Sequence, residues 1–332
     1  MKRDTMKRGA MKRNNAGASD IRRKLRGVWA TLLLDVNEDG SPRMASIDEQ
    51  LQALAHAGVD GVYAHGTAGE FHLLTDPMFE SISIRFSENA RALGLPFQIG
   101  ASHPLPRQAL ERVAFASELR PLAIQVTLPD WTAIDTATAS RFLAGCADAA
   151  GDIPLVLYNP PHARTVLDAD ALVRLCDAVP TLAGLKCGGG NGEWYRRMEA
   201  VLARIAVFIP GHAYASGVLA GAHGSCSNMA CLDPAAAVVW ARQTETDPGA
   251  ARDLERRVAA FMDDAIAPIL NAGWQGFVCD KAMAAAGGWT RISARLLWPH
   301  EGVDGATIER IRLSAARHIP EFARNVDARE FT

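Results

Sequence analysis

The chain has 332 residues, of which 48% are hydrophobic and 22% are charged, and its formal net charge is −2 at pH 7. These values are typical of a soluble globular protein and give no electrostatic footprint for nucleic acid. No apolar run approaches the roughly 20 residues that a membrane-spanning helix needs. The six cysteines form no Cys-x-x-Cys pair, so neither a zinc site nor a redox motif is indicated. We therefore expect free thiols in a cytoplasmic protein.

The sequence divides into three parts. Residues 1–26 repeat Met-Lys-Arg three times and lack the apolar stretch of a secretory signal, which predicts a basic, disordered tail. Residues 27–240 alternate short apolar runs with longer helical patterns and are expected to form the main domain. Residues 241–332 have helical patterns only, and we expect them to pack on that domain as a C-terminal extension.

Eight runs rich in Val, Ile and Leu predict strands that are buried on both faces. In chain order they are GVWATLLLDV (27–36), GVDGVYAHG (58–66), LPFQIGAS (95–102), PLAIQVTLP (121–129), IPLVLYNP (153–160), LAGLKCGG (182–189), AVFIPGH (206–212) and GAHGSCSNMA (221–230). Helical patterns lie between them, for example at Asp76–Leu93, Leu105–Leu119, Ala137–Ala150 and Asp168–Val179. Eight strand–helix units predict a (β/α)8 TIM barrel. An open doubly wound sheet is the rival fold, disfavoured because no Gly-x-Gly-x-x-Gly follows the first strand.

Lys186 is unusual because it ends an apolar strand in a chain that has few lysines. The six lysines are Lys2, Lys7, Lys12, Lys24, Lys186 and Lys281. In a TIM barrel the chemistry lies where the strands end. Tyr158 precedes Lys186 by 28 residues, about one repeat, so the two should stand on adjacent strands about 5 Å apart. A lysine amine attacks carbonyl carbons when its pKa is lowered, and burial is expected to lower it.

The ends of four predicted strands carry polar or glycine-rich motifs. These are GTAGE (66–70), YNPP (158–161), GLKCGGGN (184–191) and GAHGSCSN (221–228). In this order they resemble the motifs of the dihydrodipicolinate synthase / N-acetylneuraminate lyase family, whose members are class I Schiff-base aldolases and related enzymes. The resemblance covers nearly the whole chain from Gly27 onward.

The resemblance implies a role for each matching position. Lys186 would form an imine with the keto carbon of pyruvate or another 2-oxo acid, without a cofactor or a metal. Tyr158 would shuttle protons, and the hydroxyl of Thr67 would link to it. After Gly66, the backbone N–H groups of Thr67 and Ala68 would bind the substrate carboxylate.

The family resemblance also concerns the eighth strand and the assembly. Cys226 falls where the family presents a backbone carbonyl to the imine. A homodimer or homotetramer is implied. Beyond other copies of the chain, the expected partner is a small 2-oxo acid substrate, and neither nucleic acid nor membrane is expected.

The sequence departs from the synthase branch of the family in two loops. The segment Val126–Trp131 reads VTLPDW and lacks the tyrosine that the synthase has there. Arg164 follows YNPP, but one residue later than the substrate arginine of the synthase. Trp131 offers a flat apolar wall, and Asp130 would repel a second carboxylate. We therefore expect a 2-oxo acid with a neutral polyol or aromatic tail, such as a 2-keto-3-deoxy sugar acid or an arylidene pyruvate.

Other interpretations remain open at this point. The same imine would serve a 2-keto-3-deoxy sugar acid dehydratase or a dihydrodipicolinate synthase. A metal-dependent aldolase is a third alternative, because four histidines fall near strand ends: His65, His103, His162 and His212. A non-catalytic 2-oxo-acid binding protein is a fourth. Glu70 is expected to hold backbone amides, and Lys281 to lie on a C-terminal helix, solvated or ion-paired.

Overall fold

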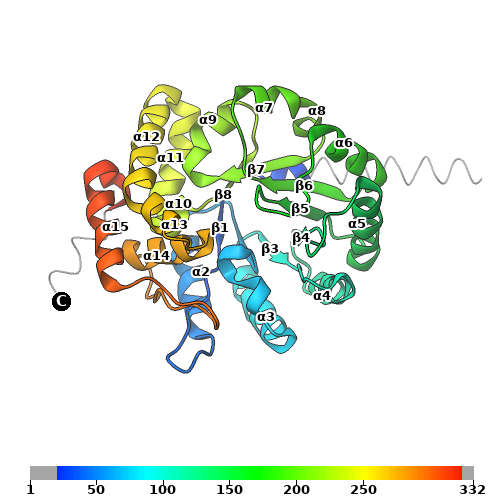
Figure 1. The fold of residues 1–332 in the computed structure, drawn as a ribbon, viewed down its shortest axis with the longest axis horizontal. Helices are drawn as coiled ribbons and strands as arrows, with labels where there is room; N and C mark the ends of the chain where they lie inside the picture. Colours follow the sequence, from blue (N-terminus) through cyan, green and yellow to red (C-terminus); the bar gives the residue numbers. More distant parts are fainter. Residues whose placement is uncertain (1–20, 324–332) are drawn as a thin grey trace, which may run out of the picture.

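Eight parallel strands close into a barrel in which each strand pairs with its sequence neighbour and β8 pairs with β1 (Figure 1). The computed structural model describes residues 21–323 of the chain. The strands are β1 (Gly27–Thr31), β2 (Gly61–Ala64), β3 (Phe97–Gly100), β4 (Ala123–Thr127), β5 (Leu155–Asn159), β6 (Leu182–Cys187), β7 (Ala206–Pro210) and β8 (Gly224–Cys226). Each lies within one of the apolar runs of the sequence, so the predicted TIM barrel is confirmed.

Helices surround the barrel, and several of them begin at a residue whose side chain caps the helix. They are α2 (Ala45–Ala57), α3 (Asp76–Ala92), α4 (Pro106–Glu118), α5 (Thr136–Ala150), α6 (Ala169–Ala178), α7 (Gly192–Arg197), α8 (Glu199–Leu202), α9 (Tyr214–Leu219) and α10 (Met229–Leu232), with short 3-10 turns η1 (Thr67–Gly69), η2 (Phe71–Leu73) and η3 (Gly211–Ala213). The carboxylate of Asp135 accepts the N–H of Thr138 at the start of α5. Such caps satisfy N–H groups that a helix cannot bond internally. The four helices predicted above are present, with ends within one residue of the expected ones.

Large side chains fill the interior of the barrel below the strand ends. Trp29 and Phe208 are fully buried there, and their rings meet edge to face with centroids 6.0 Å apart. Leu25 is buried in the same cluster. The expected tail boundary at residue 26 therefore lies too far along the chain, because Leu25 already belongs to the core. Residues 1–20 of that tail lie outside the described residues.

The chain after the barrel is helical and folds back over it. It forms α11 (Pro234–Thr246), α12 (Pro248–Phe261), a π-helical turn η4 (Met262–Ile266), α13 (Ala267–Asn271), α14 (Gly276–Gly287), α15 (Gly305–His318) and η5 (Pro320–Phe322). The boundary expected at residue 240 falls inside α11. Helix α14 packs against α10 and against η1, which follows β2. It therefore lies beside a loop at the carboxyl end of the barrel.

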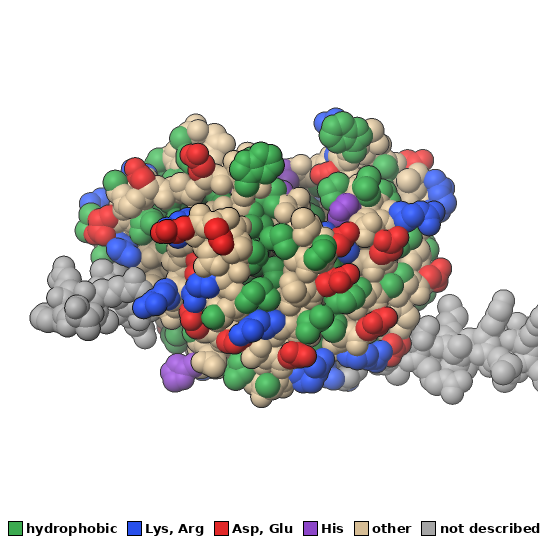
Figure 2. All heavy atoms as spheres, turned by 90° about the horizontal axis from the view of Figure 1, so that it is seen from below, with side chains coloured by type: hydrophobic (Ala, Val, Ile, Leu, Met, Phe, Trp, Pro, Cys, Tyr) green, Lys and Arg blue, Asp and Glu red, His purple; other side chains and the backbone are tan. Residues whose placement is uncertain are grey.

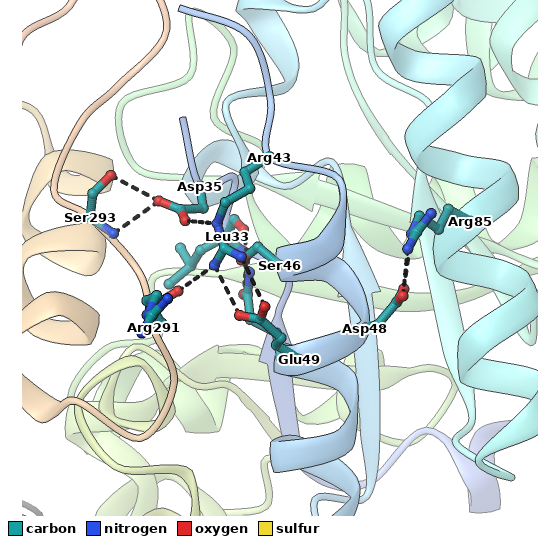
Figure 3. A network of polar contacts seen from close by, with 10 residues as sticks. Leu33, Asp35, Arg43, Ser46, Asp48, Glu49, Arg85, Arg291 and Ser293 are labelled. Carbon is teal, nitrogen blue, oxygen red and sulfur yellow. Dashed lines mark hydrogen bonds and ion pairs between the residues drawn. The ribbon is translucent and has the colours of Figure 1, made fainter. Parts of the chain in front are cut away.

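Polar contacts join the loop after β1 to the segment after α14 (Figure 3). Arg43 donates to Asp35 at 2.6 Å and to both carboxylate oxygens of Glu49 at 2.9 Å. Asp35 also accepts the N–H and the hydroxyl of Ser293 at 2.9 and 2.8 Å. The pKa of Asp35 is lowered, because burial, which raises it, is outweighed by the hydrogen bonds from Ser293 and Arg43. This network fixes the C-terminal segment beside the end of β1.

The surface agrees with the near-neutral composition. On the face drawn in Figure 2, acidic and basic side chains are interspersed with hydrophobic ones. Within residues 21–323, none of the helices has the length and apolar character required to cross a bilayer.

Candidate active site

Lys186 and Tyr158 are register partners on β6 and β5. The Lys186 nitrogen Nζ lies 4.3 Å from the centroid of the Tyr158 ring. Parallel neighbouring strands hold paired residues at the same height, which is why the spacing in the sequence predicts this adjacency. An amine and a phenol are thus held together at the carboxyl end of the barrel.

A second phenol, that of Tyr63, also contacts Lys186. Nζ donates to the Tyr63 hydroxyl oxygen at 3.4 Å and lies 4.5 Å from the centroid of the ring. Because β2 and β6 stand opposite each other in the ring of eight strands, the lysine side chain reaches across the barrel. Tyr63 was not identified as a site residue from the sequence.

Thr67 contributes the hydroxyl contact that the family resemblance implies. Its hydroxyl donates to the Tyr158 oxygen at 3.3 Å. Within the described part of the chain, the backbone N–H groups of Thr67 and Ala68 make no hydrogen bond, so both donors remain for a ligand. Both residues line the cavity described below.

Gly66 lets these groups come close to one another. A Cβ atom at this position would lie 2.7 Å from the Tyr63 ring and 3.7 Å from Nζ of Lys186. The backbone of Gly66 has φ −77°, which any residue can adopt. The requirement for glycine here is therefore steric, since a side chain would displace the Tyr63 ring.

The charge state of Lys186 depends on burial and on three acidic neighbours. Burial, the largest influence, lowers its pKa, while ionised Tyr63, Cys226 and Tyr158 raise it, and the net pKa is raised. This net direction differs from the lowering expected from burial alone. Burial also raises the pKa of Tyr63 and that of Cys226, so these two groups are neutral near pH 7. At neutral pH they therefore contribute no negative charge, and burial is the influence that favours the free amine.

Lys186 opens into a cavity of about 1140 Å³ at the carboxyl ends of the strands. The polar and aromatic side chains that line it include Thr31, Tyr63, Thr67, His72, His103, Asp130, Trp131, Tyr158, His162, Lys186, His212, Cys226, Asn228, Asp280 and His300. Among the residues that line the cavity within the described chain, Lys186 is the single lysine and there is no arginine. Asp280 was not identified from the sequence.

The remaining predicted site residues fall into two groups. Trp131 lines the cavity at its rim and is 91% exposed, and Cys226 lines it from the end of β8. Arg164 is exposed and does not line the cavity, although Ala163 and Thr165 do. The loop after β5 thus turns Arg164 away from the cavity, and its expected contact with the substrate finds no support in the structure.

Glu70 and Lys281 form a buried ion pair next to the site. Their charged atoms are 2.7 Å apart, and both side chains are 0% exposed. Glu70 also accepts the backbone N–H of Leu297 at 2.7 Å, which agrees with its expected role of holding amides. Glu70 directly follows η1, which carries Thr67, so the pair connects this turn to α14. Lys281 is therefore ion-paired on a C-terminal helix, which is one of the two outcomes expected from the sequence.

The histidines considered as metal ligands do not converge. His103, His162 and His212 line the cavity, whereas His65 is buried outside it and bonds Ser83 at 2.9 Å. Residues 21–323 contain no group of three or more His, Cys, Asp or Glu side chains arranged to hold a metal ion. The metal-dependent alternative therefore has no ligand cluster in this part of the chain.

The model of the dihydrodipicolinate synthetase family matches residues 24–273. The chain belongs to this family. The matched span contains Lys186, Tyr158 and the Thr67 loop, so the motifs that suggested the resemblance lie inside the family's own pattern.

Curated relatives in the family are distant and align over part of the chain. An uncharacterized DapA-like lyase from Thermococcus onnurineus is 25% identical over 163 residues, covering 49% of this chain and 54% of that protein. A 4-hydroxy-tetrahydrodipicolinate synthase from Acidovorax is 28% identical over 171 residues, covering 51% and 56%. The chain thus spans about half the length of the curated relatives it matches.

Solved structures of the family share the fold over most of their length. YagE of E. coli, a prophage protein of this family solved with pyruvate, has a TM-score of 0.78 at 19% identity and covers 88% of this chain and 98% of its own. Sialic acid aldolase from Ruminococcus gnavus has a TM-score of 0.77 at 16% identity, and the match covers 92% of this chain and 99% of that one. At these identities the likeness supports the fold alone.

Proposed function

We propose that this protein is a Schiff-base lyase. Lys186 forms an imine with the keto carbon of pyruvate or a related 2-oxo acid, and a carbon–carbon bond of the substrate is then broken or made. The observation that carries the proposal is a half-buried lysine held between two phenols in a cavity whose described lining contains no other lysine or arginine. Family membership supports it, as do YagE in complex with pyruvate and sialic acid aldolase, of which a catalytic lysine mutant has been solved.

In this proposal each contacting group has a defined task. The Lys186 amine attacks the keto carbon, and loss of water leaves the imine, which acts as the electron sink, so the reaction needs no cofactor. Tyr158, hydrogen-bonded to Thr67, exchanges protons with the substrate oxygen. The unoccupied N–H groups of Thr67 and Ala68 receive the substrate carboxylate.

The charges of the cavity favour a substrate with one carboxylate. Asp130 and Asp280 are the carboxylates among the described residues that line it, and Lys186 is consumed by the imine. Burial lowers the pKa of His72, His103 and His212, so these imidazoles are neutral near pH 7. A second substrate carboxylate would have no cationic partner and would meet Asp130 at the rim.

The proposed substrate is therefore a 2-oxo acid with a neutral tail, either a 2-keto-3-deoxy sugar acid or an arylidene pyruvate. Exposed Trp131 at the rim offers a flat surface for a sugar face or an aromatic ring. A dehydratase would use the same imine and differ in the bond that breaks. We also propose that the protein acts in the cytoplasm as a homodimer or homotetramer, which sedimentation velocity would test.

A side-by-side turnover assay tests the substrate proposal. Purified protein is incubated with pyruvate plus aspartate semialdehyde, with a 2-keto-3-deoxy sugar acid, and with an arylidene pyruvate. Released pyruvate and dehydrated product are measured separately, with a chelator-treated sample and a Lys186→Arg sample as controls. We expect one of the neutral-tailed substrates to give the highest kcat/KM. A tenfold preference for aspartate semialdehyde would refute the substrate class, and loss of activity with chelator would refute the imine mechanism.

A further inference from the structure

Asp280 introduces a carboxylate into the site from a different part of the chain. It lies on α14, next to Lys281, whose ion pair with Glu70 fixes this helix against η1. Asp280 lines the same cavity as Lys186 and Tyr63. The carboxylate and the amine therefore share one cavity, although 94 residues separate them in the sequence.

The Asp280 carboxylate is not engaged in a structural contact. Lys281 bonds Glu70, and Asp35 is held by Arg43 and Ser293, but no hydrogen bond or ion pair within residues 21–323 involves the side chain of Asp280. Buried carboxylates with a structural role are paired or hydrogen-bonded. Asp280 is half-buried, has no such partner and lines the cavity that also contains Lys186, so it is available for proton transfer.

The electrostatics couple Asp280 to the reacting nitrogen. Burial raises the pKa of Asp280 to about 6, and the charge of Lys186 opposes that rise. The charge of Asp280 in turn contributes to the raised pKa of Tyr63, after the larger effect of burial. The charge of Asp280 also reaches the thiols of Cys231 in α10 and Cys279 in α14. His72 of η2 and His300 of the C-terminal segment line the same cavity. Of all these groups, Lys186 is the one whose positive charge lowers the pKa of Asp280.

We propose that Tyr63 and Asp280 form a second proton-transfer arm of this site, which takes a proton from Lys186 before imine formation and supplies it to the leaving oxygen afterwards. The inference rests on the proposed Schiff-base function. Tyr63 touches the reacting nitrogen, and Asp280 acts through Tyr63 by holding the transferred proton. This arm lies across the barrel from Tyr158, which remains free to serve the substrate oxygen.

The proton balance of the step closes without a further reactant. The Lys186 ammonium passes a proton to the Tyr63 oxygen, and the Tyr63 hydroxyl proton moves through solvent water in the shared cavity to Asp280, leaving a free amine and a carboxylic acid. The amine adds to the keto carbon, and its proton moves to the former carbonyl oxygen to give a carbinolamine. The carbon–oxygen bond then breaks, the leaving oxygen departs as water with the proton stored on Asp280, and the nitrogen lone pair forms the C=N bond. Asp280 is again a carboxylate and faces the iminium cation.

The experiment measures imine formation rather than turnover. Purified full-length protein is mixed with pyruvate at pH 5 to 9, quenched with borohydride at increasing times, and the reduced adduct on Lys186 is quantified by mass spectrometry. The wild type is compared with Asp280→Asn, Asp280→Glu, Tyr63→Phe and Asp263→Asn. Asp263 is exposed in η4 and serves as a control for the loss of one negative charge in the C-terminal part.

For the wild type we expect the rate to fall as the pH drops through about 6, because Asp280 then takes up a proton from solution. Asp280→Asn and Tyr63→Phe should form the imine roughly 100-fold more slowly at pH 7, and their rates should no longer fall at acidic pH. Asp280→Glu should keep the decrease in rate at acidic pH, and Asp263→Asn should match the wild type. A wild-type rate and pH profile in Asp280→Asn would overturn the inference while leaving the Schiff-base function intact. If Asp280→Asn does not fold, a wild-type profile in Tyr63→Phe overturns it. Absence of any adduct in the wild type would instead refute the proposed function.

Discussion

The ammonium nitrogen of Lys186 lies 4.3 Å from the ring centroid of Tyr158, its register partner on the adjacent strand. The Tyr158 hydroxyl in turn accepts a hydrogen bond from Thr67, which comes from the loop after β2. Three chain segments thus meet around the Tyr158 side chain, because the carboxyl ends of all barrel strands lie on the same face. The proposed chemistry follows from this convergence.

Replacing Tyr158 with Phe should slow turnover by roughly two to four orders of magnitude, the usual scale for a positioned acid or base. Pyruvate binding should weaken much less, because the N–H groups of Thr67 and Ala68 remain. Turnover and the dissociation constant, measured by steady-state kinetics and calorimetry, check this. Thr67→Ser keeps the hydroxyl and should retain most activity. Equal losses in binding and rate would make Tyr158 a packing residue.

Gly66→Ala should reduce turnover at least tenfold while leaving the fold in place. The added Cβ would lie 2.7 Å from the Tyr63 ring, so the ring must shift and its contact with the Lys186 amine must change. Misplacing reacting groups by about 1 Å costs roughly 100-fold in rate. Gly305→Ala is the matched control, because nothing lies within 4 Å of a Cβ there. Wild-type kinetics in Gly66→Ala would show that the Tyr63 contact is dispensable.

The fold and part of the site could be predicted from the sequence for specific physical reasons. Apolar runs mark strands that are buried on both faces, and parallel neighbours hold Tyr158 and Lys186 at one height. Tyr63 was missed because an aromatic residue in a buried strand is ordinarily a packing residue. Its one signal is its position three residues before Gly66, at the end of a strand whose side chains alternate inward and outward.

Asp280 could not be placed from the sequence. Its helix is far from the barrel motifs along the chain, and only the fold of the C-terminal segment over the barrel brings it to the cavity. Arg164 is the reverse case, a residue that was expected at the site but does not line the cavity. The chain position just after YNPP suggests a substrate contact, but side-chain direction in a loop depends on local backbone geometry that spacing does not encode.

Breaking the Glu70–Lys281 pair should destabilise the protein strongly. Glu70→Gln leaves a buried lysine without its partner, which typically costs about 3–5 kcal/mol. The double variant Glu70→Gln with Lys281→Met should recover part of this loss, because no unpaired charge remains. Urea unfolding of Glu70→Gln, of Lys281→Met and of the double variant measures the difference. The exposed Arg120–Asp152 pair gives the control, and Asp152→Asn should leave the midpoint unchanged. Additive losses in the double variant would contradict the pairing argument.

Asp280→Asn should make the protein more stable at pH 7. Burial raises the Asp280 pKa from 3.8 to about 6, so the folded state binds its proton more tightly than the unfolded state. Wild-type stability should therefore fall as the pH rises from about 4 to 6, and the variant should lack this fall. The gain at pH 7 should be about 1–3 kcal/mol, measured by urea unfolding at pH 4 and pH 7. A variant that is less stable at pH 7 would assign Asp280 a structural role.

The covalent imine is tested most directly by trapping it and locating the modified residue. Wild-type protein and Lys186→Arg are each treated with pyruvate and borohydride, digested, and mapped by mass spectrometry. We predict one reduced pyruvate adduct per chain on the peptide that carries Lys186, with loss of activity. We predict no adduct in Lys186→Arg, whose circular dichroism and unfolding midpoint should match the wild type because the positive charge is retained. Labelling of Lys281, or a wild-type protein that stays unmodified and active, would contradict the account.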